Sequence, residues 1–108
     1  MYLPRVTLSF GAADTTKSAN LVLQGERTIF DLIVRIPDWT NAVTATLSIL
    51  NGNGLTIYSI AGLTDPQLDP PCYIQVARMI AGGAQVKVVL SGVPGGSGGD
   101  VTIDVGCE

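Results

Sequence analysis

Apolar and polar side chains alternate in several short stretches of the chain, and this period of two is typical of β-strands with one buried face. The alternation is clearest over residues 43–50 and recurs over residues 4–10. Residues 28–36 are rich in β-branched and aromatic side chains, which also favour a strand. Further strands are expected at residues 21–23, 55–60, 72–79, 85–90 and 101–105.

Turn-forming residues separate these stretches. The Asn-Gly-Asn-Gly sequence at residues 51–54 predicts a β-hairpin, because both residue types tolerate positive φ. Residues 11–20 are small and polar and are expected to form a connection, with a strand at its end as an open alternative. The proline-containing residues 61–71 are expected to form a loop. The glycine-rich residues 92–99 are expected to form a flexible hairpin tip.

No segment has a helical period, and 108 residues suit one core. Seven or eight short strands joined by turns predict an all-β fold: one antiparallel β-sandwich or small barrel, Ig-like or jelly-roll-like, over residues 1–108.

The strand at residues 28–36 has an ambiguous second face. Strict alternation places four apolar side chains on one face, Phe30, Leu32, Val34 and Ile36, and a mixed set on the other, Ile29, Asp31, Ile33 and Arg35. The mixed face predicts that Ile29 and Ile33 are partly covered by a partner.

The composition supports such a partner. The chain is 46% hydrophobic and 14% charged, with a mean hydropathy of +0.39. A folded chain of this mass exposes about 5,700 Å², which so few charges cover poorly, so apolar docking patches are expected. Self-association or docking onto another protein follows as a prediction.

The net charge of −3 and the lack of a basic stripe argue against nucleic-acid binding. The N-terminal residues lack the features of a signal peptide. The apolar stretches are shorter than the ~20 residues that span a bilayer, so no membrane association is expected.

Candidate catalytic groups are sparse. The absence of histidine excludes a histidine-assisted nucleophile within this chain. Asp65 with Asp69, or Asp100 with Asp104, could act as acid and base or bind calcium, but turn capping and solvated loop ends are the favoured interpretation. The sequence therefore predicts neither an enzyme nor a cofactor or metal site.

Cys72 and Cys107 have no further cysteine or histidine partners, which argues against zinc. Two free cysteines, buried or without a role, are the favoured interpretation. The alternative is a disulfide between them, which would stabilise the fold by about 3 to 4 kcal/mol. Trp39 stands at a strand junction and is expected to be buried, with an exposed binding residue as the alternative.

Residues 36–49 (IPDWTNAVTATLSI), the turn at residues 51–54 and Tyr58 resemble a pattern of small β-sandwich virion proteins of tailed bacteriophages. The resemblance implies a non-enzymatic capsid decoration or cement protein that binds and stabilises the phage head. It also implies a virion location, after assembly in the host cytoplasm, and the major capsid protein or other virion proteins as partners. A homo-oligomer is expected, with a trimer as the first candidate.

Residues 61–71 and 92–99 depart from the pattern, so a tail, collar or baseplate module stays open. A carbohydrate-binding or adhesive β-sandwich is a further alternative. It requires Trp39, Tyr58 or Tyr73 to be exposed in a shallow groove.

The N-terminal segment and the glycine-rich tip are predicted to contact the partner, because chain ends and glycine-rich tips conform readily to a neighbouring surface. Both are expected to be mobile in the isolated protein and ordered in the assembly. The candidate contact residues are Met1, Tyr2 and Leu3 at the N-terminus, Pro94, Gly95 and Gly96 in the tip, and Ile29 and Ile33 on the mixed strand face.

Overall fold

The computed structural model describes residues 5–21, 27–64, 67–80 and 83–107. Within these ranges the chain forms eight strands and no helix, which confirms the all-β prediction. The strands are β1 (Val6–Phe10), β2 (Thr16–Asn20), β3 (Arg27–Ile36), β4 (Thr44–Leu50), β5 (Thr56–Thr64), β6 (Gln67–Ile80), β7 (Gln85–Leu90) and β8 (Gly99–Cys107).

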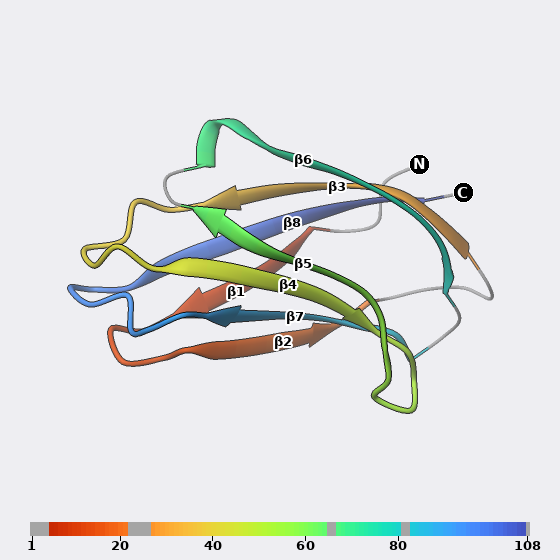
Figure 1. Cartoon of the computed structure of the whole chain (residues 1–108), viewed down its shortest axis with the longest axis horizontal. Helices are drawn as coiled ribbons and strands as arrows, with labels where there is room; N and C mark the ends of the chain where they lie inside the picture. Colours follow the sequence, from red (N-terminus) through yellow and green to blue (C-terminus); the bar gives the residue numbers. More distant parts are fainter. Residues whose placement is uncertain (1–4, 22–26, 65–66, 81–82, 108) are drawn as a thin grey trace.

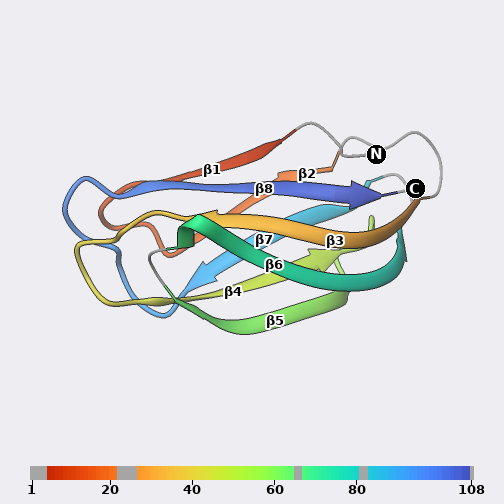
Figure 2. The ribbon, with the colours of Figure 1, turned by 90° about the horizontal axis from the view of Figure 1, so that it is seen from above.

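The strands form two four-stranded antiparallel sheets that pack as a β-sandwich (Figure 1). Sheet A has the order β1-β8-β3-β6, and sheet B has the order β2-β7-β4-β5. The strands run along the long axis of the molecule, so the connections gather at its two ends (Figure 2).

The predicted alternations of β1 and β4 are confirmed. Leu8 and Phe10 are buried between exposed neighbours, and Val43, Ala45, Leu47 and Ile49 enter the core. Each fully buried aliphatic or aromatic side chain contributes about 1.5 to 3 kcal/mol, so the alternation alone orients these strands.

The hairpin predicted at residues 51–54 is also confirmed. The Asn51 side-chain oxygen accepts hydrogen bonds from the backbone N–H groups of Asn53 (2.9 Å) and Leu55 (3.0 Å). Gly54 has a φ of 83°, a conformation that glycine adopts without steric cost.

Alternation fails in β3. Ile29 pairs with Cys107 of β8 and Asp31 pairs with the adjacent Gly106, so Phe30 is one extra residue in β3. This β-bulge buries Ile29 completely and leaves Phe30 49% exposed. The predicted faces are therefore wrong for these two residues, and the Ile29 side chain is not available to a partner.

Residues 61–71 do not form a loop over their described part. β5 continues to Thr64 and β6 begins at Gln67, so both are longer than predicted. β6 contains Pro70 and Pro71, which a strand tolerates at a sheet edge, because its outer N–H groups need no partner. The prolines also fall in an irregular stretch, since Val34 pairs with Cys72 and Ile36 with Gln67.

The expected connection at residues 11–20 contains strand β2 at its end. β2 is polar and has no fully buried side chain, because it forms an edge of sheet B. The strand predicted at residues 21–23 falls mostly outside the described part of the chain.

Candidate binding surfaces

One end of the sandwich is built from three segments that are distant in sequence: residues 11–15, 37–43 and 91–98 (Figures 1 and 2). We call this surface the loop end. The backbone N–H of Gly95 donates to the carbonyl of Ala12 (3.0 Å), and the backbone N–H of Asn41 donates to that of Pro94 (2.8 Å). The Asn41 amide also donates to the Val93 carbonyl (3.1 Å). These bonds hold the three segments together.

The glycine-rich segment is not the hairpin tip that the sequence predicts. It joins β7 of sheet B to β8 of sheet A, so it crosses between the sheets. The Pro94 side chain is fully buried and unavailable to a partner. Gly95 is half-buried, Gly96 is exposed, and Val93 is 44% exposed. The prediction of a hairpin tip assumed that this segment makes few contacts. The buried Pro94 and the hydrogen bonds to Ala12 and Asn41 show that it is packed against the rest of the loop end.

Glycine is required in this segment for steric reasons. Gly98 has a φ of +72°, and a β-carbon there would overlap the Phe10 carbonyl oxygen. At Gly96 a β-carbon would overlap the Thr40 hydroxyl. The glycines thus permit close packing of the backbone in this segment.

The loop end carries few charges. In its three segments the charged side chains are Asp14 and Asp38. The Asp14 carboxylate accepts a hydrogen bond from the Gly11 backbone N–H (2.8 Å) and lies 3.4 Å from the Lys17 amine. The Gly11 bond, with Lys17 in support, lowers the pKa of Asp14. The loop end is therefore a preformed, mostly neutral surface on which Val93 is an exposed apolar side chain.

The outer face of sheet A carries an ion network. Arg5 donates two hydrogen bonds to the carboxylate of Asp104 (2.9 and 3.0 Å), and Arg35 donates a third (3.2 Å). The Arg5 hydrogen bond is the largest cause of the lowered pKa of Asp104, with Arg35 adding to it. Asp104 is thus an anchored anion, whereas a general acid at neutral pH needs a raised pKa. Asp65 and the side chain of Asp69 lie outside the described part.

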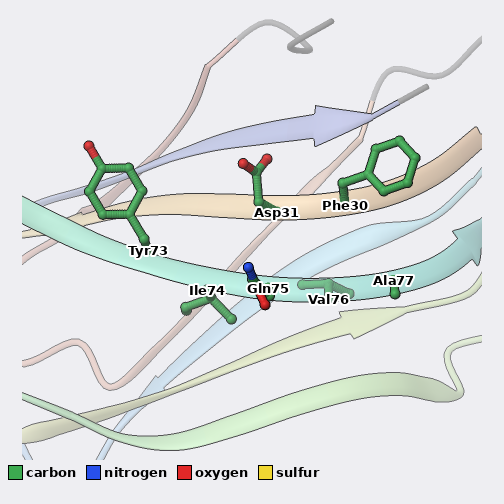
Figure 3. Close-up of a pocket in the computed structure, with 7 residues that line it drawn as sticks. All are labelled: Phe30, Asp31, Tyr73, Ile74, Gln75, Val76 and Ala77. Carbon is green, nitrogen blue, oxygen red and sulfur yellow. The ribbon is translucent and has the colours of Figure 1, made fainter.

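A shallow depression lies farther along the same outer face, between β3 and β6 (Figure 3). Its volume is about 450 Å³, and the described residues that line it are Phe30, Asp31, Tyr73, Ile74, Gln75, Val76 and Ala77. Figure 3 shows Phe30, Asp31 and Tyr73 projecting to the same side of the sheet, with the carboxylate of Asp31 between the two rings. Asp31 and Gln75 are cross-strand partners.

The three aromatic residues named for a carbohydrate site have different environments. Trp39 is buried, as predicted, and meets Phe10 edge to face. Tyr58 is half-buried, its hydroxyl donates to the Gln75 carbonyl (3.4 Å), and the Arg78 guanidinium lies 5.7 Å from its ring. Tyr73 is 68% exposed and lines the depression. Tyr73 therefore meets the condition of that alternative.

Sequence reasoning missed Phe30, Asp31 and Gln75 as candidate binding residues. The exposure of Phe30 depends on the bulge, and no signal in the sequence reports it. Of the predicted contact residues, Ile33 is half-buried and pairs with Tyr73 on one side and Asp104 on the other. Met1, Tyr2 and Leu3 lie outside the described residues.

Cys72 and Cys107 are free thiols, which agrees with the favoured interpretation. They lie on opposite sides of β3, facing Val34 and Ile29 respectively. The separation along the strand is therefore about 16 Å, too far for a disulfide, whose Cα atoms lie within ~7 Å. Burial raises the pKa of the Cys72 thiol.

Two further features concern residues 5–21, 27–64, 67–80 and 83–107. These residues contain no cluster of three or more acidic, cysteine or histidine side chains that could hold a metal ion. They include no helix of the length and apolarity needed to cross a membrane.

No family model and no curated protein sequence matches this chain. Among solved structures, a Bacillus endospore appendage that forms disulfide-linked pili is 17% identical, with a TM-score of 0.48 over 97% of this chain and 84% of its own. The sugar-binding C-terminal domain of EclA is 18% identical, with a TM-score of 0.42 over 98% of this chain and 78% of its own.

The VP2 protein of an infectious bursal disease virus subviral particle is 15% identical, with a TM-score of 0.36. That match covers 94% of this chain, which spans 29% of the VP2 chain. All three likenesses concern β-rich folds, and none carries a functional conclusion at these TM-scores. The resemblance to tailed-bacteriophage virion proteins is not confirmed by them and stays a prediction.

Proposed function

We propose that this chain is a non-enzymatic structural protein of a bacteriophage virion. Its first candidate role is a decoration or cement protein that binds the major capsid protein and stabilises the head, and a tail, collar or baseplate module is the variant. The observation that supports the proposal is the loop end, where hydrogen bonds join three distant segments into one surface.

A preformed surface favours docking onto a lattice, because little conformational entropy is lost when it binds. The small side chains of the loop end allow a partner backbone to approach closely, and Val93 supplies an apolar contact. Because the loop end carries few charged groups, binding removes few charges from water. Gly95 and Gly96 keep their predicted role as contact residues, now on a packed loop.

A non-enzymatic role is supported by the state of Asp104, one of the candidate acids. Asp104 is held as an anion by Arg5 and Arg35, and its pKa is lowered. The interaction has the character of a structural cross-strand link in sheet A, not of a catalytic acid.

The proposal is tested with heads assembled without this chain by the phage that encodes it. Purified protein is added, and the bound fraction is measured by co-sedimentation and cryo-electron microscopy. Val93→Glu is expected to weaken head binding at least about tenfold, because it places an unpaired charge in an apolar contact. Leu55→Glu is the matched control, because Leu55 is 65% exposed on the hairpin at the opposite end.

Equal loss with both variants, or no binding of the unmodified protein to heads, tails or baseplates, would contradict the proposal. Sedimentation equilibrium of the free protein tests the homo-oligomer separately. A trimer is the expected state, and a monomer at high micromolar concentration would remove that part of the proposal.

A further inference from the structure

We infer that the depression between Phe30 and Tyr73 binds one neutral sugar unit of a glycan, a hexose or an N-acetylhexosamine. This function goes beyond the proposed structural role and uses a different surface. The loop end is the proposed docking surface, whereas the depression lies on the outer face of sheet A.

The size of the depression fits a small ligand. Its volume of about 450 Å³ falls within the ~300–1,000 Å³ of small-molecule sites. A protein partner needs a contact of about 800 Å² on each side. On the β8 side the aromatic surface is bordered by a charged group, because Ile33, the cross-strand partner of Tyr73, also pairs with Asp104, which Arg5 and Arg35 hold. This border favours a small ligand over a broad apolar protein contact.

The side chains of Phe30 and Tyr73 are exposed at the surface of sheet A. The β3 bulge directs Phe30 outward, and Tyr73, which is 68% exposed, occupies an outward-facing position of β6 before the buried Ile74. β-bulges often re-aim a side chain next to a functional site. Exposed rings with an apolar body suit the C–H face of a sugar ring, which packs against the negative face of an aromatic system.

The polar groups of the depression match sugar hydroxyls. The carboxylate of Asp31 accepts hydrogen bonds, and the side-chain amide of its cross-strand partner Gln75 both donates and accepts. The Tyr73 hydroxyl adds a group of both kinds. The depression therefore offers hydrogen-bond acceptors and donors to the hydroxyl groups of a sugar, and two aromatic rings to its C–H face.

The charge of the depression selects a neutral sugar. Asp31 is the charged side chain among the described lining residues, which include no lysine or arginine. A sialic acid, uronic acid or sulfated sugar would bring a second negative charge close to the carboxylate of Asp31. A simple cation would leave the donors of Gln75 and Tyr73 unused.

The open shape predicts weak binding at each copy, with a Kd of about 1 mM. Several copies on one particle would raise the avidity for a surface rich in glycans. The full chain is therefore tested by NMR with methyl glycosides of glucose, galactose, mannose and N-acetylglucosamine, each titrated to about 50 mM, well above that Kd.

At least one glycoside is expected to shift the ring signals of Phe30 and Tyr73 and the side-chain amide of Gln75. Tyr73→Ala is expected to weaken binding at least about tenfold, the loss of one stacking contact. Tyr73→Phe keeps the ring and is expected to remain within about threefold. Leu55→Ala truncates an exposed apolar side chain that does not line the depression and is expected to bind unchanged. Thermal unfolding verifies that every variant is folded.

The inference is overturned if none of the glycosides shifts these signals, or if binding survives in both Tyr73→Ala and Phe30→Leu. It is also overturned if tetramethylammonium or sialic acid binds more tightly than every neutral glycoside. Head binding by the Tyr73→Ala variant is measured in parallel. Loss of sugar binding with head binding intact separates this inference from the proposed docking role.

Discussion

The rings of Phe10 and Trp39 meet edge to face, with their centroids 5.7 Å apart and their planes at 77°. Phe10 ends β1, and Trp39 lies in the connection that leads from sheet A to sheet B. Both side chains are buried, so this pair fixes the loop end to the core of the sandwich.

Removing the Trp39 ring is therefore expected to be strongly destabilising. Trp39→Ala should lower the free energy of unfolding by about 3 to 5 kcal/mol, because a large buried aromatic side chain leaves a cavity. Urea unfolding followed by far-UV circular dichroism measures the change. Leu55→Ala, at an exposed site, should stay within about 0.5 kcal/mol. A loss under 1 kcal/mol for Trp39→Ala would show that the ring does not anchor the loop end.

Alanine substitutions at two glycines distinguish the cost of backbone strain from the cost of steric overlap. Gly54 and Gly98 both have positive φ, 83° and 72°, but a β-carbon at Gly54 would meet nothing within 4 Å. Gly54→Ala should cost about 1 kcal/mol from the strained conformation alone. Gly98→Ala should cost at least about 3 kcal/mol, because the new methyl group overlaps the Phe10 carbonyl. Equal costs in urea unfolding would rule out the close packing of the loop end.

The Asp104 network predicts a pH dependence at acid pH. The arginines lower the pKa of Asp104 in the folded state below its unfolded value of about 3.9. The stabilisation is therefore complete above about pH 4 and is lost as the pH falls through the folded-state pKa. Because the pairs are partly exposed, the contribution should not exceed about 1 kcal/mol.

Unfolding midpoints of the unmodified protein and Asp104→Asn between pH 7 and pH 2 measure this effect. The difference between them should shrink towards acid pH, and Arg5→Gln should show part of the same change. A difference that is constant over this range would mean that ionisation of Asp104 does not contribute.

The two thiols should differ in reactivity. Cys107 is buried, while Cys72 is partly exposed and has a pKa raised by burial. Because the thiolate is the reactive form, a disulfide reagent should modify Cys72 slowly at pH 7 and faster at alkaline pH. Cys107 should react only after unfolding. Cys72→Ser is the control, and rapid labelling of that variant under native conditions would contradict the burial of Cys107.

The strands and the hairpin could be predicted from sequence because their causes are local. In β4 the alternation of Ala45, Leu47 and Ile49 with polar residues places one face in the core whatever the neighbouring strand is. The turn at residues 51–54 needs only residues that tolerate positive φ. The burial of Trp39 follows from its position before an apolar alternation.

The bulge in β3 could not be predicted in this way. The alternation of β3 assigns Ile29 and Phe30 to opposite faces, but the pairing with Cys107 and Gly106 of β8 decides which of them enters the core. Because β8 is distant in sequence, no local pattern reports this register. The depression could not be predicted from local sequence either, because the cross-strand pairing of Asp31 with Gln75 depends on the register of β6.

By itself, then, the sequence determined the all-β class, the β4–β5 turn and the side chains that form most of the core, because period and turn chemistry act over a few residues. The tertiary structure alone decided that residues 91–98 cross between the sheets, and that Pro94 is buried while Phe30 is exposed. The physical reason is that these features depend on which distant strands pair and in which register, and hydrogen bonds between strands leave no trace in local composition.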